Sequence, residues 1–216
     1  MIIKDTTLLS FAEFSIREKT DVLIEGNRIT KIGEELCETE QLYSGHDVIN
    51  GRGLYLIPGL VNAHAHTGMT LLRGAAEDVK VEDWFNKHIW IYEQNLTPDD
   101  VYFGTLLGAA EMLLSGGGRV LGLPGYGEII EGAPADLVLI DPASPNMQPE
   151  HNVFANILYS LGERNIHTVI VDGKVVVSNG KLVNFPLAGG MAELYNEIAK
   201  IKNRITADRG GPMQSY

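Results

Sequence analysis

The sequence predicts an α+β fold, with short strands toward both ends of the chain and helices in its middle and at its C-terminus. Short apolar runs separated by turn residues occupy residues 15–61 and 125–183, whereas residues 81–114 show the apolar spacing of helices. The 216 residues, of which 44% are hydrophobic and 21% charged, match an ordinary globular protein. This length allows one domain or two small ones.

The N-terminal strands are separated by clear turn signals. Residues 21–25 and 28–32 form a predicted hairpin around Gly26 and Asn27, a pair that favours positive φ. A second predicted pair joins residues 47–50 to residues 54–57, and it stops at Pro58. Residues 60–66 then predict one more strand, which is apolar at its start and polar at its end.

Two helices are predicted in the middle of the chain. Residues 81–94 place four side chains at near-helical spacing, namely Trp84, Phe85, His88 and Tyr92. The second helix begins with Thr97 as N-cap, Pro98 at the first helical position and Asp100 as capping-box partner. It runs to about Leu114, because the Ser-Gly-Gly-Gly segment at residues 115–118 ends any helix.

The C-terminal part returns to strands and turns. Residues 135–141 predict a buried strand, with Asp136 and Asp141 bonding turn backbone groups, and residues 166–183 predict a meander with Asp-Gly and Asn-Gly turns. Residues 191–205 predict a helix that docks through one apolar stripe, and the tail from residue 207 is expected to be disordered. The stripe comprises Met191, Leu194, Tyr195, Ile198, Ile201 and Ile205.

The formal net charge of -11 limits the classes of partner. Because this charge repels phosphate groups, neither nucleic acid nor a membrane surface is an expected partner, and a small neutral or cationic ligand suits the chain better. The longest mostly apolar run, residues 101–114, is too short to span a bilayer, and Asp5 interrupts any export signal. Cys37 is the only cysteine, which fits a reducing compartment, so we expect a cytoplasmic protein.

His64 and His66 are the residues that suggest chemistry. On a strand, side chains two positions apart project from the same face, as two ligands of one zinc ion require. A surface pair or a hydrogen-bonded pair of histidines is the alternative when the spacing is taken alone. The remaining histidines show no ligand-like spacing, and we expect each to be structural or solvated: His46, His88, His151 and His167.

A longer motif surrounds the two histidines. It reads Leu56-Ile57-Pro58-Gly59-Leu60-Val61-Asn62-Ala63-His64-Ala65-His66, followed by Met69-Thr70-Leu71-Leu72-Arg73-Gly74. Further stretches continue it at residues 76–78, 83–84, 93, 97–98, 119–123, 135–141 and 169–174. Together they closely resemble the amidohydrolase superfamily, and within it the branch of S-adenosylhomocysteine and methylthioadenosine deaminases and triazine chlorohydrolases.

The resemblance implies a composite β-sandwich built from both chain ends, joined to the remnant of a metal-dependent TIM barrel. A complete barrel needs about 250 residues, whereas residues 58–118 supply one strand and about two helices. The expected domains are therefore the sandwich at residues 1–57 and 119–185, the barrel remnant at residues 58–118, and a C-terminal helix and tail at residues 186–216.

The resemblance also implies roles for individual residues. His64 and His66 would bind a divalent metal, zinc first with iron or manganese as alternatives, while Glu93 and Trp84 would contact the substrate. An isolated glutamate can equally be solvated, and a tryptophan at helical spacing can equally belong to the core. The family's later ligands and its proton-transferring glutamate are not found, so no catalytic residue is identified.

Two functional hypotheses remain open. The first is a metal-dependent hydrolase acting on non-peptide C–N bonds, which deaminates a purine nucleoside or related heterocycle once the missing ligands are supplied from elsewhere. The second is an inactive deletion remnant that serves as a structural or oligomerising β-domain. Because a barrel remnant would expose an unpaired strand and apolar helix faces, we expect a homo-oligomer, with a dimer as the simplest form.

Overall fold

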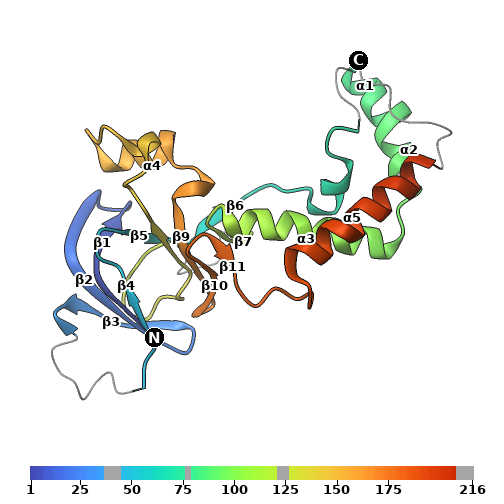
Figure 1. Ribbon diagram of the computed structural model, residues 1–216. Coiled ribbons are helices and arrows are strands. Elements are labelled where there is room, and N and C mark those ends of the chain that lie inside the picture. The colour runs from blue at the N-terminus through green and yellow to red at the C-terminus, as the bar shows by residue number, and fades with distance from the viewer. Residues whose placement is uncertain (37–44, 76–78, 121–126, 208–216) are drawn as a thin grey trace. The chain divides into compact units, whose positions relative to one another are not determined.

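The chain is divided into two compact units in a computed structural model that describes residues 1–36, 45–75, 79–120 and 127–207 (Figure 1). The first unit comprises Met1–Ala63 and Met112–Val183, and the second comprises His64–Glu111 and Asn184–Tyr216. Each unit therefore combines segments that lie far apart in the sequence. The predictions for Cys37 and for the tail from residue 208 fall outside the described residues.

One sheet dominates the first unit, and both ends of the chain contribute strands to it. Its nine described strands follow the order β11-β10-β9-β8-β5-β1-β2-β3, with β4 also paired to β1. The strands are β1 (Ile2–Ser10), β2 (Ser15–Glu25), β3 (Arg28–Glu34), β4 (Val48–Asn50), β5 (Tyr55–Pro58), β8 (Leu137–Ile140), β9 (Ile166–Val171), β10 (Lys174–Ser178) and β11 (Lys181–Leu182). The antiparallel pairing of β5 with β8 joins the two halves.

The two faces of the sheet contribute to separate hydrophobic cores. Leu56, Leu137 and Leu139 belong to one core, whereas Ile57, Val138 and Ile140 belong to the other. The second core is completed by Met147 and by α4 (Val153–Ser160). Because consecutive side chains of a strand point to opposite faces, β8 is buried along its whole length, as its apolar run predicts.

The α+β class and the joint contribution of both chain ends are confirmed by these pairings. The Ile29 amide also donates to the Ala133 carbonyl at 2.9 Å, and the Ala135 amide donates to the Asn27 carbonyl at 2.9 Å, so the start of β3 meets the segment before β8. These nine strands are connected within one sheet. A division into two facing sheets, as in a sandwich, stays a prediction.

The predicted hairpins are confirmed together with their turn chemistry. Gly26 has φ of 59° between β2 and β3, and Asp172 and Gly173 have φ of 52° and 73° between β9 and β10. The Asp136 carboxylate accepts a hydrogen bond from the Asp172 amide at 2.6 Å, and Asp141 accepts one from the Ala143 amide at 2.8 Å. Both aspartates therefore bond turn backbone groups, as expected.

The predicted pairing of residues 47–50 with residues 54–57 is wrong. Both β4 and β5 run parallel to β1, one after the other, so the chain does not reverse between them. Gly51 permits this path, since a Cβ at Gly51 would lie 2.7 Å from the Cβ of Thr6. Gly51 therefore allows close approach to β1, whereas Gly53, with φ of 77° and no atom within 4 Å of an added Cβ, lets the chain turn without forming a hairpin.

The second unit is helical. Its elements are η3 (Thr67–Leu72), α1 (Val81–Asp83), the π-helical turn η4 (Trp84–Ile89), α2 (Trp90–Glu93), α5 (Gly190–Ala207) and α3 (Pro98–Leu114) as far as Glu111. The capping box of α3 is confirmed, because the Thr97 amide donates to the Asp100 carboxylate at 2.7 Å and the Asp100 amide donates to the Thr97 hydroxyl at 3.3 Å. Gly116, with φ of 84°, follows the end of this helix as expected.

The C-terminal helix packs within the second unit through most of its predicted stripe. Ile201 and Ile205 share a core with Leu72, Ile89 and Tyr92. Tyr195 does not follow the prediction, because it is 57% exposed. One short helix, α4, was not expected from the sequence; it begins at Asn152, whose side chain accepts a hydrogen bond from the Ala155 amide at 3.0 Å.

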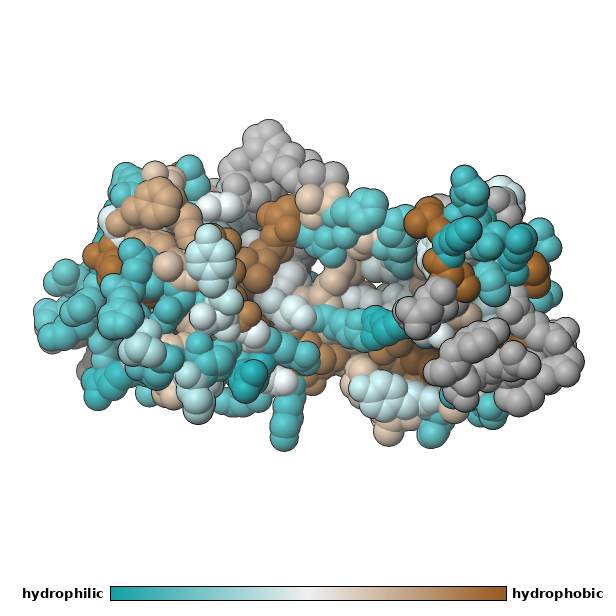
Figure 2. Space-filling model, turned by 90° about the horizontal axis from the view of Figure 1, so that it is seen from above, coloured by the Kyte–Doolittle hydropathy of each residue, from teal (hydrophilic) through white to brown (hydrophobic). Residues whose placement is uncertain are grey.

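Among the described residues, no helix has both the length and the apolar character needed to cross a membrane. On the face drawn in Figure 2, hydrophilic residues cover most of the surface and hydrophobic residues form separate patches.

The contact between two turns of the first unit can be tested with glycine substitutions. We expect Gly173→Ala to destabilise this unit by about 3 kcal/mol or more, because the new Cβ would lie 2.0 Å from the Gly26 carbonyl oxygen at a positive φ. Gly180→Ala is the control, since its φ is also positive but its nearest atom lies at 3.5 Å; about 1–2 kcal/mol is expected. Urea unfolding followed by circular dichroism measures both, and equal losses would contradict the contact.

The Asp100–Arg204 ion pair, which links α3 to α5, predicts a dependence of stability on pH. Burial raises the pKa of the Asp100 carboxyl, but hydrogen bonds from Arg204 and Thr97 outweigh burial and hold this pKa below its usual value. A lowered pKa stabilises the folded state above the unfolded value of about 3.9, and this stabilisation is lost as the pH falls through the folded pKa.

Asp100→Asn should therefore destabilise the second unit by about 1–3 kcal/mol at pH 7 and by much less at acidic pH. Asp99→Asn is the matched control, because Asp99 lies on the same helical turn and is exposed. Urea unfolding followed by tryptophan fluorescence reports on this unit, which contains both tryptophans. Equal destabilisation by the two variants would contradict a role for the ion pair.

Candidate metal and ligand site

His64 and His66 follow a strand rather than lie on it. The strand β6 (Leu60–Asn62) pairs in parallel with β7 (Gly117–Val120) and ends at Asn62, so the prediction of a strand through residue 66 is wrong. The described ladder ends where Asn62 faces Val120, and the backbone beyond it is free to turn into η3. The His66 carbonyl accepts a hydrogen bond from the Met69 amide at 3.0 Å, which fixes this start of η3.

The two imidazoles nevertheless converge. Their Nε2 atoms are 2.9 Å apart, and their ring centroids are 4.7 Å apart with an interplanar angle of 63°. Both side chains are exposed. Two arrangements account for this distance. One Nε2–H can donate a hydrogen bond to the other Nε2, or both Nε2 lone pairs can point at one metal ion.

The donor atoms fit two positions of a zinc shell. An ion at the usual Zn–N distance of about 2.0–2.1 Å from both nitrogens would see them at an angle of about 90°. No group of three or more histidine, cysteine, aspartate or glutamate side chains suited to a metal occurs among the described residues. The described residues therefore fit zinc with two imidazole ligands only. A catalytic zinc site has three protein ligands and one open position, so it would need at least one more ligand.

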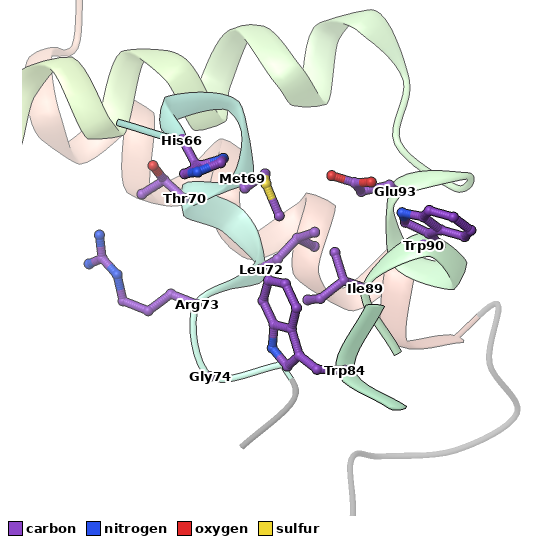
Figure 3. A pocket seen from close by; sticks show the side chains of 10 residues that line it. All are labelled: His66, Met69, Thr70, Leu72, Arg73, Gly74, Trp84, Ile89, Trp90 and Glu93. Atoms are coloured by element: carbon purple, nitrogen blue, oxygen red, sulfur yellow. The ribbon is translucent and has the colours of Figure 1, made fainter. Parts of the chain in front are cut away.

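A pocket of about 520 Å³ lies beside His66, within the usual range for small-molecule sites (Figure 3). Its lining residues come from η3 and the segments on either side of it, from η4 and from α2: His66, Met69, Thr70, Leu72, Arg73, Gly74, Trp84, Ile89, Trp90 and Glu93. The walls are mostly apolar, with His66, Arg73 and Glu93 as the groups that can carry charge. Such a pocket suits a flat, mostly apolar ring with a few polar substituents.

The predicted substrate residues Glu93 and Trp84 both line this pocket with His66, whereas His64 does not. In Figure 3 the Glu93 carboxylate points from α2 toward Met69, and the Trp84 indole lies against Leu72 and Ile89. Trp84 also packs against the core of the second unit. The same side chain therefore contributes to the core and lines the pocket.

The π-helical turn brings side chains into the pocket that helical spacing does not predict. In a π-helix, hydrogen bonds join residues five apart, so Trp84 and Ile89 stack on one side. With regular α-helical spacing the same two residues would point in different directions. Trp90, the first residue of α2, also lines the pocket although it is 53% exposed, and it is not among the site residues predicted from the sequence.

Arg73 is held in place by Glu111. The guanidinium donates two hydrogen bonds to this carboxylate, at 2.8 and 2.6 Å, and so connects the end of η3 to α3. These hydrogen bonds lower the pKa of Glu111 and raise the pKa of Arg73. Bidentate geometry of this kind orients a guanidinium more strictly than a single contact does.

None of the other histidines lines this pocket. The His167 imidazole lies 2.9 Å from the Thr168 hydroxyl, His151 is exposed, and neither joins a metal-suited group among the residues that the structure describes. The motif residues 76–78 and 121–123 fall outside the described residues.

Part of the chain is similar in sequence to a known protein family and to individual deaminases. Residues 55–118 match the model of the amidohydrolase family. The chain is 46% identical over 118 residues, or 54% of its length, to the 5-methylthioadenosine/S-adenosylhomocysteine deaminase of Carboxydothermus hydrogenoformans. It is 48% identical over 97 residues, or 44% of its length, to the 5'-deoxyadenosine deaminase of Methanococcus aeolicus. These matches span 26% and 23% of the two relatives, so the chain corresponds to about a quarter of their length.

Solved structures share the fold. An adenosine deaminase from Xanthomonas campestris with bound zinc aligns with a TM-score of 0.83 at 14% identity, across 94% of this chain and 98% of that chain. Atrazine chlorohydrolase from Arthrobacter aurescens, complexed with zinc, aligns with a TM-score of 0.76 at 11% identity, across 93% of this chain and 99% of that chain. At these identities the likeness concerns the fold alone.

The family match covers β5, β6, both convergent histidines and the helices that line the pocket. Residues 55–118 therefore match the amidohydrolase family, and the relatives to which the chain is similar include a 5-methylthioadenosine/S-adenosylhomocysteine deaminase and a 5'-deoxyadenosine deaminase.

Proposed function

We propose that the chain supplies the His64–His66 half of a divalent-metal site in an aminohydrolase that deaminates a purine nucleoside or related heterocycle. The observation that carries this proposal is the convergence of the two Nε2 atoms to 2.9 Å on the segment that matches the family. The remaining ligands come from outside the described residues, either from another chain or from a further segment.

Zinc is the proposed ion, with iron and manganese as alternatives. Imidazole nitrogen is a favourable ligand for zinc, and two solved structures that share the fold contain it. When bound, such an ion supplies Lewis-acid chemistry and activates water. The role of His64 and His66 in this scheme is to hold it at one edge of the pocket.

The pocket residues divide by chemistry. We assign Trp84 to the heterocycle, because a large flat indole offers stacking area on an otherwise apolar wall. Glu93 is assigned to the sugar, because a carboxylate accepts hydrogen bonds from hydroxyl groups. Both reach the same pocket as His66, so one ligand can touch all three.

The proposed organisation keeps the domains expected from the sequence. A composite β-sandwich at residues 1–57 and 119–185 carries a barrel segment at residues 58–118, followed by the C-terminal helix and tail at residues 186–216. We propose that the protein acts in the cytoplasm, as the single cysteine suggests, and forms a homo-oligomer.

A structural role as an oligomerising β-domain is the second candidate. Its support is that each unit forms its own core from the chain as given, through the β5–β8 pairing in the first unit and the docking of α5 in the second. A further support is that the described residues bring together only two side chains that can bind a metal, His64 and His66, and not the three of a catalytic site.

Metal content separates the two candidates. Protein purified without chelators should contain zinc by inductively coupled plasma mass spectrometry, and His64→Ala and His66→Ala should each reduce it to background, because one imidazole binds far more weakly than two. His151→Ala, which removes an exposed histidine elsewhere, should leave it unchanged. Wild-type protein without metal, even after incubation with zinc, would favour the structural role.

Ligand binding can be followed with the chain's own tryptophans. Both tryptophans of the sequence, Trp84 and Trp90, line the pocket, so intrinsic fluorescence reports on it. We expect 5'-methylthioadenosine to quench this fluorescence in a saturable manner. Glu93→Gln should weaken binding about tenfold, which corresponds to about 1.4 kcal/mol for a charged hydrogen bond.

Glu128→Gln is the control for Glu93→Gln, because Glu128 is exposed and belongs to the other unit. Equal affinity of Glu93→Gln and wild type would remove Glu93 from the ligand site. No change in fluorescence at millimolar ligand would contradict the assignment of the pocket.

A further inference from the structure

An exposed pair of metal donors can be shared between molecules. Residues 63–66 are exposed as a run, so both imidazoles can be reached from solvent. Their Nε2 atoms are 2.9 Å apart, and together they offer two ligands. Four-coordinate zinc in a structural site takes four.

We infer that, in the chain as given, a zinc ion at His64 and His66 is bound by two copies of the chain at once, so that two histidine pairs form a four-imidazole site on a two-fold axis. This inference rests on the metal half-site proposed above. It adds the partner, which is a second copy of the same chain.

The geometry suits such a site. A two-fold axis through the ion presents the same surface of both copies, so each copy contributes an identical pair of ligands. A tetrahedral shell needs the nitrogens of one pair about 3.3 Å apart at the usual Zn–N distance. Small rotations of two exposed rings widen the observed 2.9 Å to that value.

The charge distribution also favours contact at this segment. The chain has a net charge of -11, so two copies repel each other over most of their surface. Residues 57–72 contain no lysine, arginine, aspartate or glutamate. The next charged residue, Arg73, is paired with Glu111. The segment that carries the histidines therefore brings no carboxylate of its own to the contact, and the ion adds positive charge beside Glu93, which lines the pocket next to His66.

A shell of four imidazoles leaves the ion no open position. The bridged form is therefore a structural site, and it differs from the catalytic arrangement, in which ligands of other kinds complete the shell. Zinc in this form joins chains and does not activate water. The same two histidines thus have one role in the isolated chain and another where further ligands are supplied.

The test is the molar mass of the full chain during a zinc titration. Metal-free protein at micromolar concentration is titrated with zinc chloride, and mass is measured by sedimentation velocity and light scattering. We expect the mass to double, with the transition complete at one zinc per two chains, and to return to the monomer value after addition of EDTA. Magnesium, which prefers oxygen ligands, should have no effect.

His64→Ala and His66→Ala should each stay monomeric with zinc, whereas His151→Ala should dimerise as the wild type does. Because all three histidines are exposed, the variants should fold, and circular dichroism checks this. A monomer that binds one zinc would overturn the bridged site but keep the metal half-site. An absence of zinc binding would overturn both. A dimer that persists in EDTA, or in either site variant, would show that another surface joins the copies and would overturn the inference.

Discussion

The antiparallel pairing of β5 with β8 is the interaction on which the rest of the first unit depends. It joins strands from the two ends of the chain, with Leu56 facing Leu139 and Ile57 facing Val138. Each of these side chains is buried, and full burial of such a side chain stabilises a fold by about 1.5–3 kcal/mol. Immediately after β5, the Gly59 amide donates to the Asp136 carbonyl at 2.8 Å and the Leu60 amide donates to the Gly116 carbonyl at 3.0 Å. The strand that precedes the histidines is thus anchored to both halves of the chain.

Features governed by neighbouring residues could be predicted from the sequence, and features governed by distant contacts could not. The turns at Gly26 and Gly173 follow from residues that tolerate positive φ, and the start of α3 follows from the pairing of Thr97 with Asp100. In contrast, the direction of β5 depends on β1 and β8, which no local pattern specifies. The error over its pairing with β4 arose because glycine serves close approach as well as turning.

The candidate site shows the same division. The spacing of His64 and His66 predicted that their side chains converge, and the resemblance assigned Glu93 and Trp84 to the substrate; His66, Glu93 and Trp84 share one pocket. The strand expected to carry the histidines ends earlier, so convergence arises from the turn into η3 and not from the alternation of a strand. Arg73 depends on Glu111, a partner on another helix, and its orientation could not be read from its own surroundings in the sequence.

The π-helical turn at Trp84–Ile89 makes the pocket sensitive to the number of residues in this segment as well as to their identity. A π-turn accommodates one residue more than an α-helical turn between the same two ends. Deletion of a single residue here would convert the turn to regular α-helix and rotate everything on one side of it by about 100°. Trp84 or Glu93 would then leave the pocket, although no lining residue had been replaced. A one-residue deletion in this segment would therefore change which side chains meet the ligand, as a substitution in the lining would.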